Sequence, residues 1–250
     1  MILYYSACGN SRYVAEELGR LAGDDVRDLM GLSPSERLEF DEDDVLGIVC
    51  PVYAWAVPRL VVDTLSRMVI VNRPAYCYLA CTCGDSVGCT PERLGKTMKS
   101  IGLHLDAAFS FVMPETYVNL PGFNLDDTDG VRRKLDGVRR RLPMVAKHIL
   151  TRDRVVDVTR GKMPWVNSYI VNPIFYRLLI TDRRFWVTEA CVSCGRCVEE
   201  CPLHNIELVD GRPQWKGDCT NCMSCYHHCP VNAIQFGRAT KGKGQYLFSD

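Results

Sequence analysis

The sequence CVSCGRCVEECP at residues 191–202 returns as CTNCMSCYHHCP at residues 219–230, with every cysteine and the final proline in register. The second copy follows the first by 28 positions, so this part of the chain is an internal repeat. Three cysteines at this spacing can bind one four-iron cluster, while the fourth, which precedes proline, ligates the neighbouring cluster. The repeat therefore predicts two interleaved 4Fe–4S sites. The expected ligands are Cys191, Cys194, Cys197 and Cys229 for one cluster, and Cys219, Cys222, Cys225 and Cys201 for the other.

Two other uses of cysteine fit this pattern less well. A structural zinc site needs four ligands in pairs of short spacings, which two runs of four cysteines exceed. A disulfide framework is usual in secreted chains, whereas the segment from Met1 to Tyr5 has no basic region, apolar region or cleavage site of a signal peptide. We therefore favour iron–sulfur clusters and expect a cytoplasmic protein. By these motifs, residues 186–238 resemble a bacterial two-cluster ferredoxin.

Length and composition describe an ordinary globular chain. It has 250 residues, of which 47% are hydrophobic and 24% charged, enough for a mid-sized domain and a small one. Thirty basic and thirty acidic side chains cancel, so the charge gives no reason to expect binding to nucleic acid. The apolar stretch 163–180 is interrupted by two asparagines, a proline and an arginine, so we expect no membrane span. The expected domains are residues 1–150, a packed linker at 151–185, and residues 186–250.

Before residue 150, short apolar runs alternate with helical patterns. This alternation is typical of βαβ units, and the continuous apolar run 45–50 suits a strand covered by helices on both faces. We therefore predict an α/β fold with a doubly wound parallel sheet of five strands, followed by a smaller α+β domain. The clearest strands are expected at 2–5, 45–50, 74–81 and 107–112, and helices at 13–21, 58–68, 91–101 and 131–150.

Three loops after these strands carry the residues of a ligand site, because ligands of such sheets bind beyond the carboxyl ends of the strands. The loop 6–11 is small and polar and enters a helix, as a phosphate site requires, although an ordinary helix cap would look the same. The loop 51–58 holds Tyr53 and Trp55 between prolines, either to flank a flat ligand or to pack inward. In the loop 82–88, glycines allow a planar ring to approach the backbone.

These three loops together resemble those of flavodoxins over residues 1–150. The resemblance implies FMN, although Cys8 stands where flavodoxins usually have a hydroxyl residue. A dinucleotide-binding fold would need Gly-x-Gly-x-x-Gly after the first strand, and the sequence lacks it there. The implied FMN contacts are Ser6, Cys8, Gly9, Asn10 and Ser11 at the phosphate, Pro51, Val52, Tyr53, Ala54 and Trp55 beside the ring, and Thr82, Cys83, Gly84 and Asp85 at its polar edge.

The two halves together resemble the fused flavodoxin/ferredoxin proteins of anaerobes. Joining one-electron clusters to a flavin that takes one or two electrons predicts a redox converter that serves a protein partner. The alternative is a flavin-dependent reductase of a small molecule, and a third class is a cluster-based redox sensor. Asp85 and Tyr117 are the only candidate proton donors, so whether the chain is an enzyme stays open at this stage.

Two further segments can take part in such a site. The loop 114–127 is long and rich in turn residues, so it either covers the flavin or forms a surface excursion. The aromatic and aliphatic linker 151–185 is expected to pack the domains together, with a partner or membrane surface as the alternative.

Overall fold

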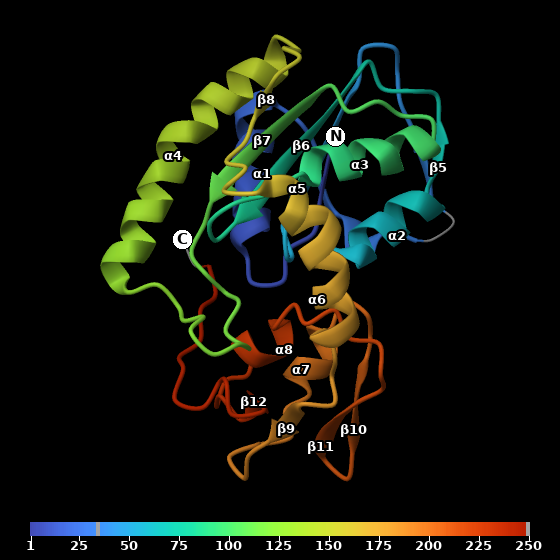
Figure 1. Cartoon of the computed structure of the whole chain (residues 1–250). Coiled ribbons are helices and arrows are strands. Elements are labelled where there is room, and N and C mark those ends of the chain that lie inside the picture. The colour runs from blue at the N-terminus through green and yellow to red at the C-terminus, as the bar shows by residue number, and fades with distance from the viewer. Residues whose placement is uncertain (34–35, 249–250) are drawn as a thin grey trace.

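A central parallel sheet organises the N-terminal part of the computed structural model, which describes residues 1–33 and 36–248 (Figure 1). Its six strands lie in the order β2-β1-β4-β6-β7-β8 and all neighbours are parallel. The first five follow the flavodoxin-like order, so the predicted doubly wound sheet is confirmed, and the short β8 adds a sixth strand at the edge. The strands are β1 (Ile2–Tyr4), β2 (Val26–Asp28), β4 (Val45–Pro51), β6 (Tyr76–Cys83), β7 (Ala107–Val112) and β8 (Val156–Asp157). A separate parallel pair joins β3 (Arg37–Glu39) to β5 (Val69–Val71), and a short 3₁₀ turn, η1, spans Leu29–Gly31.

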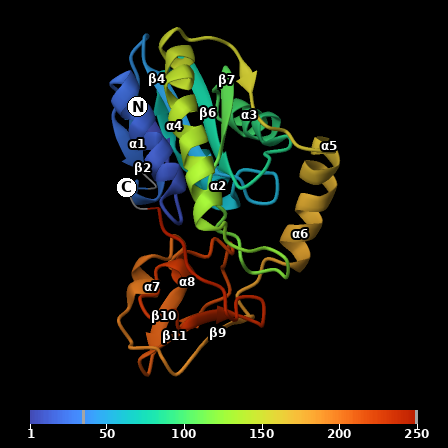
Figure 2. The ribbon, with the colours of Figure 1, turned by 90° about the vertical axis from the view of Figure 1, so that its left-hand side faces the viewer.

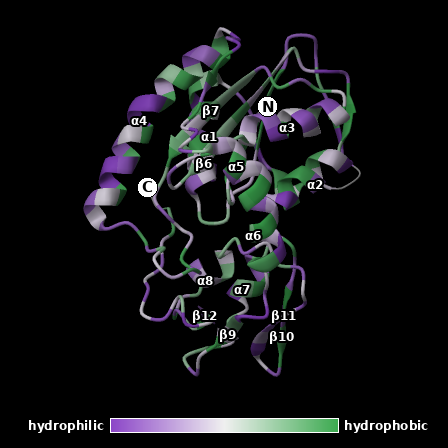
Figure 3. Cartoon of the chain, in the orientation of Figure 1, coloured by the Kyte–Doolittle hydropathy of each residue, from purple (hydrophilic) through white to green (hydrophobic). Residues whose placement is uncertain are grey.

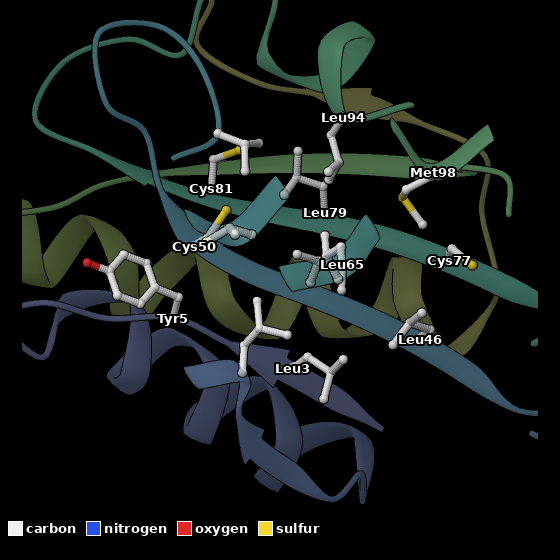
Figure 4. Packing of buried hydrophobic residues seen from close by; sticks show 14 of the residues in the cluster. Leu3, Tyr5, Leu46, Cys50, Leu65, Cys77, Leu79, Cys81, Leu94 and Met98 are labelled. Carbon is white, nitrogen blue, oxygen red and sulfur yellow. The ribbon is translucent and has the colours of Figure 1, made fainter. Parts of the chain in front are cut away.

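Helices cover both faces of this sheet (Figure 2). One face packs against α1 (Asn10–Ala22) and α4 (Thr128–Leu150), and the other against α2 (Arg59–Arg67) and α3 (Thr90–Ser100). On the second face, leucines of β1, β4 and β6 meet Leu65, Leu94 and Met98 of the two helices (Figure 4). The amphipathic helix predicted at 131–150 is confirmed as α4, whose colours alternate between polar and apolar in Figure 3.

One glycine of β4 tests how tightly this sheet packs. A methyl group on Gly47 would lie 2.4 Å from the ring carbon Cζ of the fully buried Tyr78. We expect Gly47→Ala to destabilise the fold by roughly 1–3 kcal/mol, because a packed core cannot absorb the added group. Urea unfolding measures this free energy. Gly137→Ala on α4 is the control: no atom lies within 4 Å of the added methyl, so a helix interior should gain about 0.5–1 kcal/mol. Equal effects of the two changes would contradict this account.

The small C-terminal part has its own core. Strands β9 (Phe185–Val187) and β12 (Ile234–Phe236) pair antiparallel, as do β10 (Ile206–Val209) and β11 (Arg212–Trp215). Two short helices, α7 (Arg196–Glu199) and α8 (Ser224–His227), each begin inside one copy of the cysteine repeat. Between the two parts lies a linker helix made of α5 (Pro164–Val166), the π-helical turn η2 (Asn167–Val171) and α6 (Asn172–Leu178). The predicted boundaries at residues 150 and 185 stay a prediction, although β8 extends the sheet past residue 150.

Residues 239–248 form a C-terminal arm that returns to the first loop of the chain (Figures 1 and 2). The Phe248 N–H donates to the Cys8 carbonyl over 2.9 Å, and the Phe248 ring stacks on Tyr13 with centroids 4.4 Å apart. The arm thus ties the end of the small domain to the sheet domain. Within the part of the chain that the structure describes, no helix combines the length and apolarity needed to cross a bilayer.

Candidate cofactor site

A cavity of about 500 Å³ lies where the two parts of the chain meet. Its walls include the loops after β1, β4 and β6, as expected for the carboxyl edge of a parallel sheet. The structure therefore brings together the three loops that the sequence singles out. Lining residues among those predicted are Ser6, Cys8, Asn10, Ser11, Pro51, Val52, Tyr53, Ala54, Trp55, Thr82, Cys83, Gly84 and Asp85. Gly9, also predicted, contacts the C-terminal arm instead.

The loop after β1 leads to an open helix end. Gly9 precedes α1 with φ 93°, and no side chain caps this end. The amides of a first helical turn lack partners inside the helix, so they can bind an anion. The Ser6 hydroxyl accepts from the Gly9 N–H over 3.1 Å and keeps its own proton to donate. Glycine is required at position 9 both by its φ and because an added methyl would lie 2.8 Å from the Phe248 Cβ.

Two side chains of this loop hold neighbouring loops in place. The buried hydroxyls of Ser11 and Thr82 are 2.7 Å apart, which joins the first loop to the third. The Asn10 amide donates to the Pro114 carbonyl over 2.9 Å and accepts from the Tyr246 hydroxyl over 3.3 Å. Ser11 and Asn10 therefore fix the shape of the cavity, and the backbone amides and Ser6 are the groups left to face an anion.

The backbone of the aromatic loop has a conformation that residues other than glycine rarely adopt. Ala54 and Trp55 have φ of 47° and 62°, in the left-handed region, which costs energy for residues other than glycine. The turn is closed by backbone hydrogen bonds of 2.9 and 3.2 Å between Tyr53 and Ala56. The Trp55 indole donates to the Ser86 hydroxyl over 3.2 Å, which ties this loop to the third one.

The linker helix supplies the remaining support for the aromatic loop. Ser168 donates to the Trp55 carbonyl over 2.9 Å, and the Asn172 amide donates to the Ala54 carbonyl over 2.9 Å. Both side chains are buried, and each also binds the sheet domain: Ser168 accepts from the Cys89 N–H over 2.8 Å, and Asn172 accepts from Arg93 over 2.8 Å. These contacts join the linker helix to the sheet domain; that the linker packs the two parts together stays a prediction. The sequence analysis did not predict the role of Ser168 and Asn172 at the site. The signal that could have indicated it was two polar residues four positions apart in an apolar stretch.

The loop 114–127 covers another side of the cavity and is anchored by the small domain. The Lys243 ammonium donates to the carbonyls of Val118 (2.9 Å), Leu120 (3.1 Å) and Phe123. The His227 Nε2 faces the Thr116 carbonyl at 2.7 Å, while its Nδ1 accepts from the Tyr246 N–H over 3.2 Å. Since burial lowers the pKa of His227 to about 4, the ring is neutral and Nε2 carries the proton. Of the two alternatives for this loop, a cover over the site and a surface excursion, its place in the wall of the cavity favours the first.

Two hydroxyls in the wall leave hydrogen-bonding capacity for a ligand. The buried hydroxyls of Tyr117 and Thr220 have no hydrogen-bond partner of acceptable geometry among the described residues. Burial raises the pKa of Tyr117, so this hydroxyl keeps its proton. The other predicted proton donor, Asp85, is exposed and accepts from the Ser86 hydroxyl over 3.2 Å. Together with the open end of α1, these groups fit a ligand that carries both an anion and polar ring atoms.

The eight repeat cysteines gather around two further, smaller cavities. The four lining the first are Cys191, Cys194, Cys197 and Cys229, and the four lining the second are Cys201, Cys219, Cys222 and Cys225. In both cavities the last cysteine of one copy thus joins three of the other. The Sγ atoms of Cys201 and Cys229 accept backbone N–H groups over 3.2 Å, from Asn205 and Ala233 respectively. Among the described residues, no three His, Cys, Asp or Glu side chains are close enough to hold a single metal ion.

The second cysteine cavity adjoins the large one. Cys222 lines both, and its neighbours Thr220 and Asn221 also line the large cavity. Across this boundary, the Ser224 hydroxyl donates to the Ala7 carbonyl over 3.0 Å. The sequence motif predicted the cysteine pairings, but it carried no sign that one of the two sites would face the cavity of the other domain.

Comparison with known proteins gives one family match and several similar solved structures. Residues 180–234 match the 4Fe-4S dicluster domain family, and no curated protein matches the chain. Similar solved structures include a flavodoxin of Streptococcus pneumonia TIGR4, with 14% identity, a TM-score of 0.38, and coverage of 60% of this chain and 95% of that one. Another is a putative flavoprotein of Bacteroides eggerthii, with 17% identity, a TM-score of 0.33 and coverage of 55% and 96%. A third is rubredoxin oxygen:oxidoreductase of the anaerobe Desulfovibrio gigas, with 12% identity, a TM-score of 0.30 and coverage of 60% and 36%.

At these identities and scores, the strand order carries the assignment of the fold. The chain is a fusion of a flavodoxin-like domain with a 4Fe–4S dicluster domain. The 4Fe-4S dicluster match is typical of a protein that transfers electrons.

Proposed function

We propose that this chain transfers electrons within itself between two 4Fe–4S clusters and one FMN, and thereby converts between one-electron and two-electron chemistry for a redox protein partner. The observation that carries the proposal is the position of Cys222. This one residue lines both a cysteine cavity and the large cavity that the flavodoxin-like loops surround. A cluster ligand in the wall of a flavin site gives the shortest connection between the two kinds of cofactor.

The cysteines would hold the clusters in interleaved sets. Support comes from the two small cavities, each surrounded by three cysteines of one copy and the last cysteine of the other. Thiolates are the ligands that such clusters require, and backbone N–H groups on the sulfurs of Cys201 and Cys229 would tune the reduction potentials.

The large cavity would hold FMN. The phosphate would lie at the open end of α1, where Ser6 and backbone amides donate to it. The ring would lie between the aromatic loop and the 82–85 loop, where Gly84 lets the Glu115 carboxylate approach so closely that an added methyl would lie 2.1 Å from its Oε2. When bound, FMN supplies the exchange between one and two electrons. The surrounding chain would fix the distance from the ring to Cys222.

Cofactor analysis of protein purified without oxygen tests this proposal. We expect about eight iron and eight sulfide per chain from two four-iron clusters, and about one FMN. Removal of iron with a chelator should abolish the cluster absorbance while FMN stays bound, because the phosphate loop contains no cluster ligand. A product that contains zinc and lacks iron, or that never binds FMN, would contradict the proposal.

A further inference from the structure

The charged side chains in the wall of the large cavity are all negative. Of the described residues that line it, Asp85 and Glu115 carry carboxylates, and no lysine, arginine or histidine is among them. A negative group of a ligand is therefore favoured at the open end of α1, where backbone amides can donate to it, and disfavoured near the two carboxylates. Such a wall acts differently on two forms of one ligand that differ in charge.

The Glu115 carboxylate has a fixed position in this wall. Its Oε1 accepts the N–H groups of Thr116 and Tyr117 over 3.0 and 2.8 Å. Its Oε2 lies against Gly84, so closely that a methyl group on that glycine would be 2.1 Å from it. Among the described residues, no group donates a hydrogen bond to Oε2. One oxygen is thus occupied and the other is free, next to the loop 82–85 that would lie at the polar edge of the FMN ring.

The loop that carries Glu115 is held by both parts of the chain. The Glu115 N–H donates to Oδ2 of Asp126, which precedes α4, over 2.7 Å. From the other side, the ammonium of Lys243 on the C-terminal arm donates to backbone carbonyls of the same loop. The small domain therefore helps to place a carboxylate in the wall of a cavity that the flavodoxin-like loops surround.

The positive side chains near this loop do not cancel the charge of Glu115 in the cavity. Lys134 pairs with Asp126 over 2.7 Å, Lys243 is taken up by backbone carbonyls, and the Arg184 guanidinium lies 4.9 Å from the centre of the Phe236 ring. None of these three side chains lines the cavity. The charge that a ligand meets on this side is therefore that of the carboxylates.

The negative groups differ in how strongly water screens them. Asp85 is exposed, so water and salt weaken its field, whereas Glu115 is only partly exposed and lies against the backbone of the loop 82–85. Cys222, when it holds a cluster, adds negative charge at another side of the cavity. That contribution is the same whatever residue stands at position 115, so a change at Glu115 isolates the effect of its own charge.

We propose that Glu115 sets the redox balance of the bound flavin by opposing its anionic reduced form. The proposal rests on the proposed function, because it takes FMN to be the ligand of the cavity. Two electrons from the clusters and one proton from water convert the neutral oxidised ring into an anionic reduced ring. A fixed carboxylate beside the ring raises the free energy of the reduced form above that of the oxidised form, which makes the reduced flavin a stronger electron donor.

The test measures how tightly the full-length, cluster-loaded and flavin-free chain binds FMN in its two forms. Equilibrium dialysis without oxygen gives the dissociation constants of oxidised FMN and of FMN kept reduced with dithionite. In Glu115→Gln, the constant for reduced FMN divided by that for oxidised FMN should fall at least about tenfold, because glutamine keeps an oxygen for the two N–H groups and removes the charge. The flavin potential of the holoprotein should rise correspondingly, by about 30 mV for each factor of ten in a two-electron couple.

Asp85→Asn is the matched control. It removes a carboxylate of the same cavity, but an exposed one, so the ratio of the two constants should change by less than about threefold. A purely structural role of Glu115 would weaken the binding of both forms of FMN equally and leave their ratio unchanged.

The outcomes separate this inference from the proposed function. If Glu115→Gln binds FMN with the wild-type ratio, or if Asp85→Asn shifts the ratio as much, the role of Glu115 is wrong while the proposed function stands. If the wild-type chain binds no FMN in either form, the proposed function fails and this inference fails with it.

Discussion

Cys201→Ala should remove the cluster of the second set and leave the other cluster in place. Cys201 belongs by sequence to the first motif, but it lies in the cavity of Cys219, Cys222 and Cys225. We expect the iron content to fall by half, by about four atoms per chain, because each set holds one four-iron cluster. Since the second set adjoins the cavity proposed for FMN, reduction of FMN by a one-electron donor should fall by a large factor. Iron analysis, electron paramagnetic resonance and stopped-flow absorbance measure these effects.

Cys229→Ala is the matched control, because Cys229 occupies the equivalent position in the second motif and lies in the other cavity. It should cost the same amount of iron but spare the cluster beside Cys222. If Cys201→Ala instead removes the signal of the first-set cluster, the interleaved pairing is wrong. Loss of both clusters in both variants would show that the small domain folds only when fully loaded, and the iron bound on stepwise reconstitution would then decide the pairing.

Asn172→Ala should weaken FMN binding although Asn172 is not among the residues that line the cavity. Its amide donates to the Ala54 carbonyl and accepts from Arg93, so it holds the left-handed turn of the aromatic loop against the sheet domain. Loss of these buried hydrogen bonds costs about 1–3 kcal/mol, which corresponds to roughly a 5-fold to 150-fold weaker affinity. Fluorescence titration of the flavin-free protein measures the dissociation constant.

Asn167→Ala tests whether this effect is specific. Asn167 is on the same linker helix, but its amide donates to the Lys162 carbonyl over 2.9 Å and not to a carbonyl of the aromatic loop. FMN affinity should therefore stay within about twofold of wild type, as expected for a surface substitution. Equal losses in both variants would mean that the linker helix acts through general stability and not through the Ala54 contact.

Local patterns predicted most of this fold. The continuous apolar run at 45–50 and the alternation of runs with amphipathic helices were enough for the sheet, because burial on both faces shows directly in the sequence. Strand β8 was not predicted. Its residues Val156 and Asp157 are exposed, and they join the sheet only through pairing with Ala108 and Phe109. A two-residue strand has too little periodicity to be recognised.

The candidate site also has residues that the sequence predicted and residues that it did not. The cysteine motif and the three loops were found because each is contiguous in sequence and follows a recognisable element. Ser168, Asn172 and Thr220 were missed, since their contribution depends on contacts between distant segments, such as that of Ser168 with Trp55, 113 positions away. Lys243 was missed for the same reason: only the folded chain brings its ammonium to the carbonyls of loop 114–127.

The C-terminal arm also sets the order in which this protein can mature. The Tyr246 hydroxyl reaches the Asn10 side chain across 236 positions of sequence, and Phe248 rests on Gly9, which precedes α1. On the ribosome, the phosphate loop is made long before the residues that brace it. Because the arm leaves the small domain only after the second cysteine motif, a nascent chain cannot complete its flavin pocket before the segment that takes up iron has been synthesised. Flavin retention should therefore follow completion of the chain through the arm, whether or not iron has been loaded.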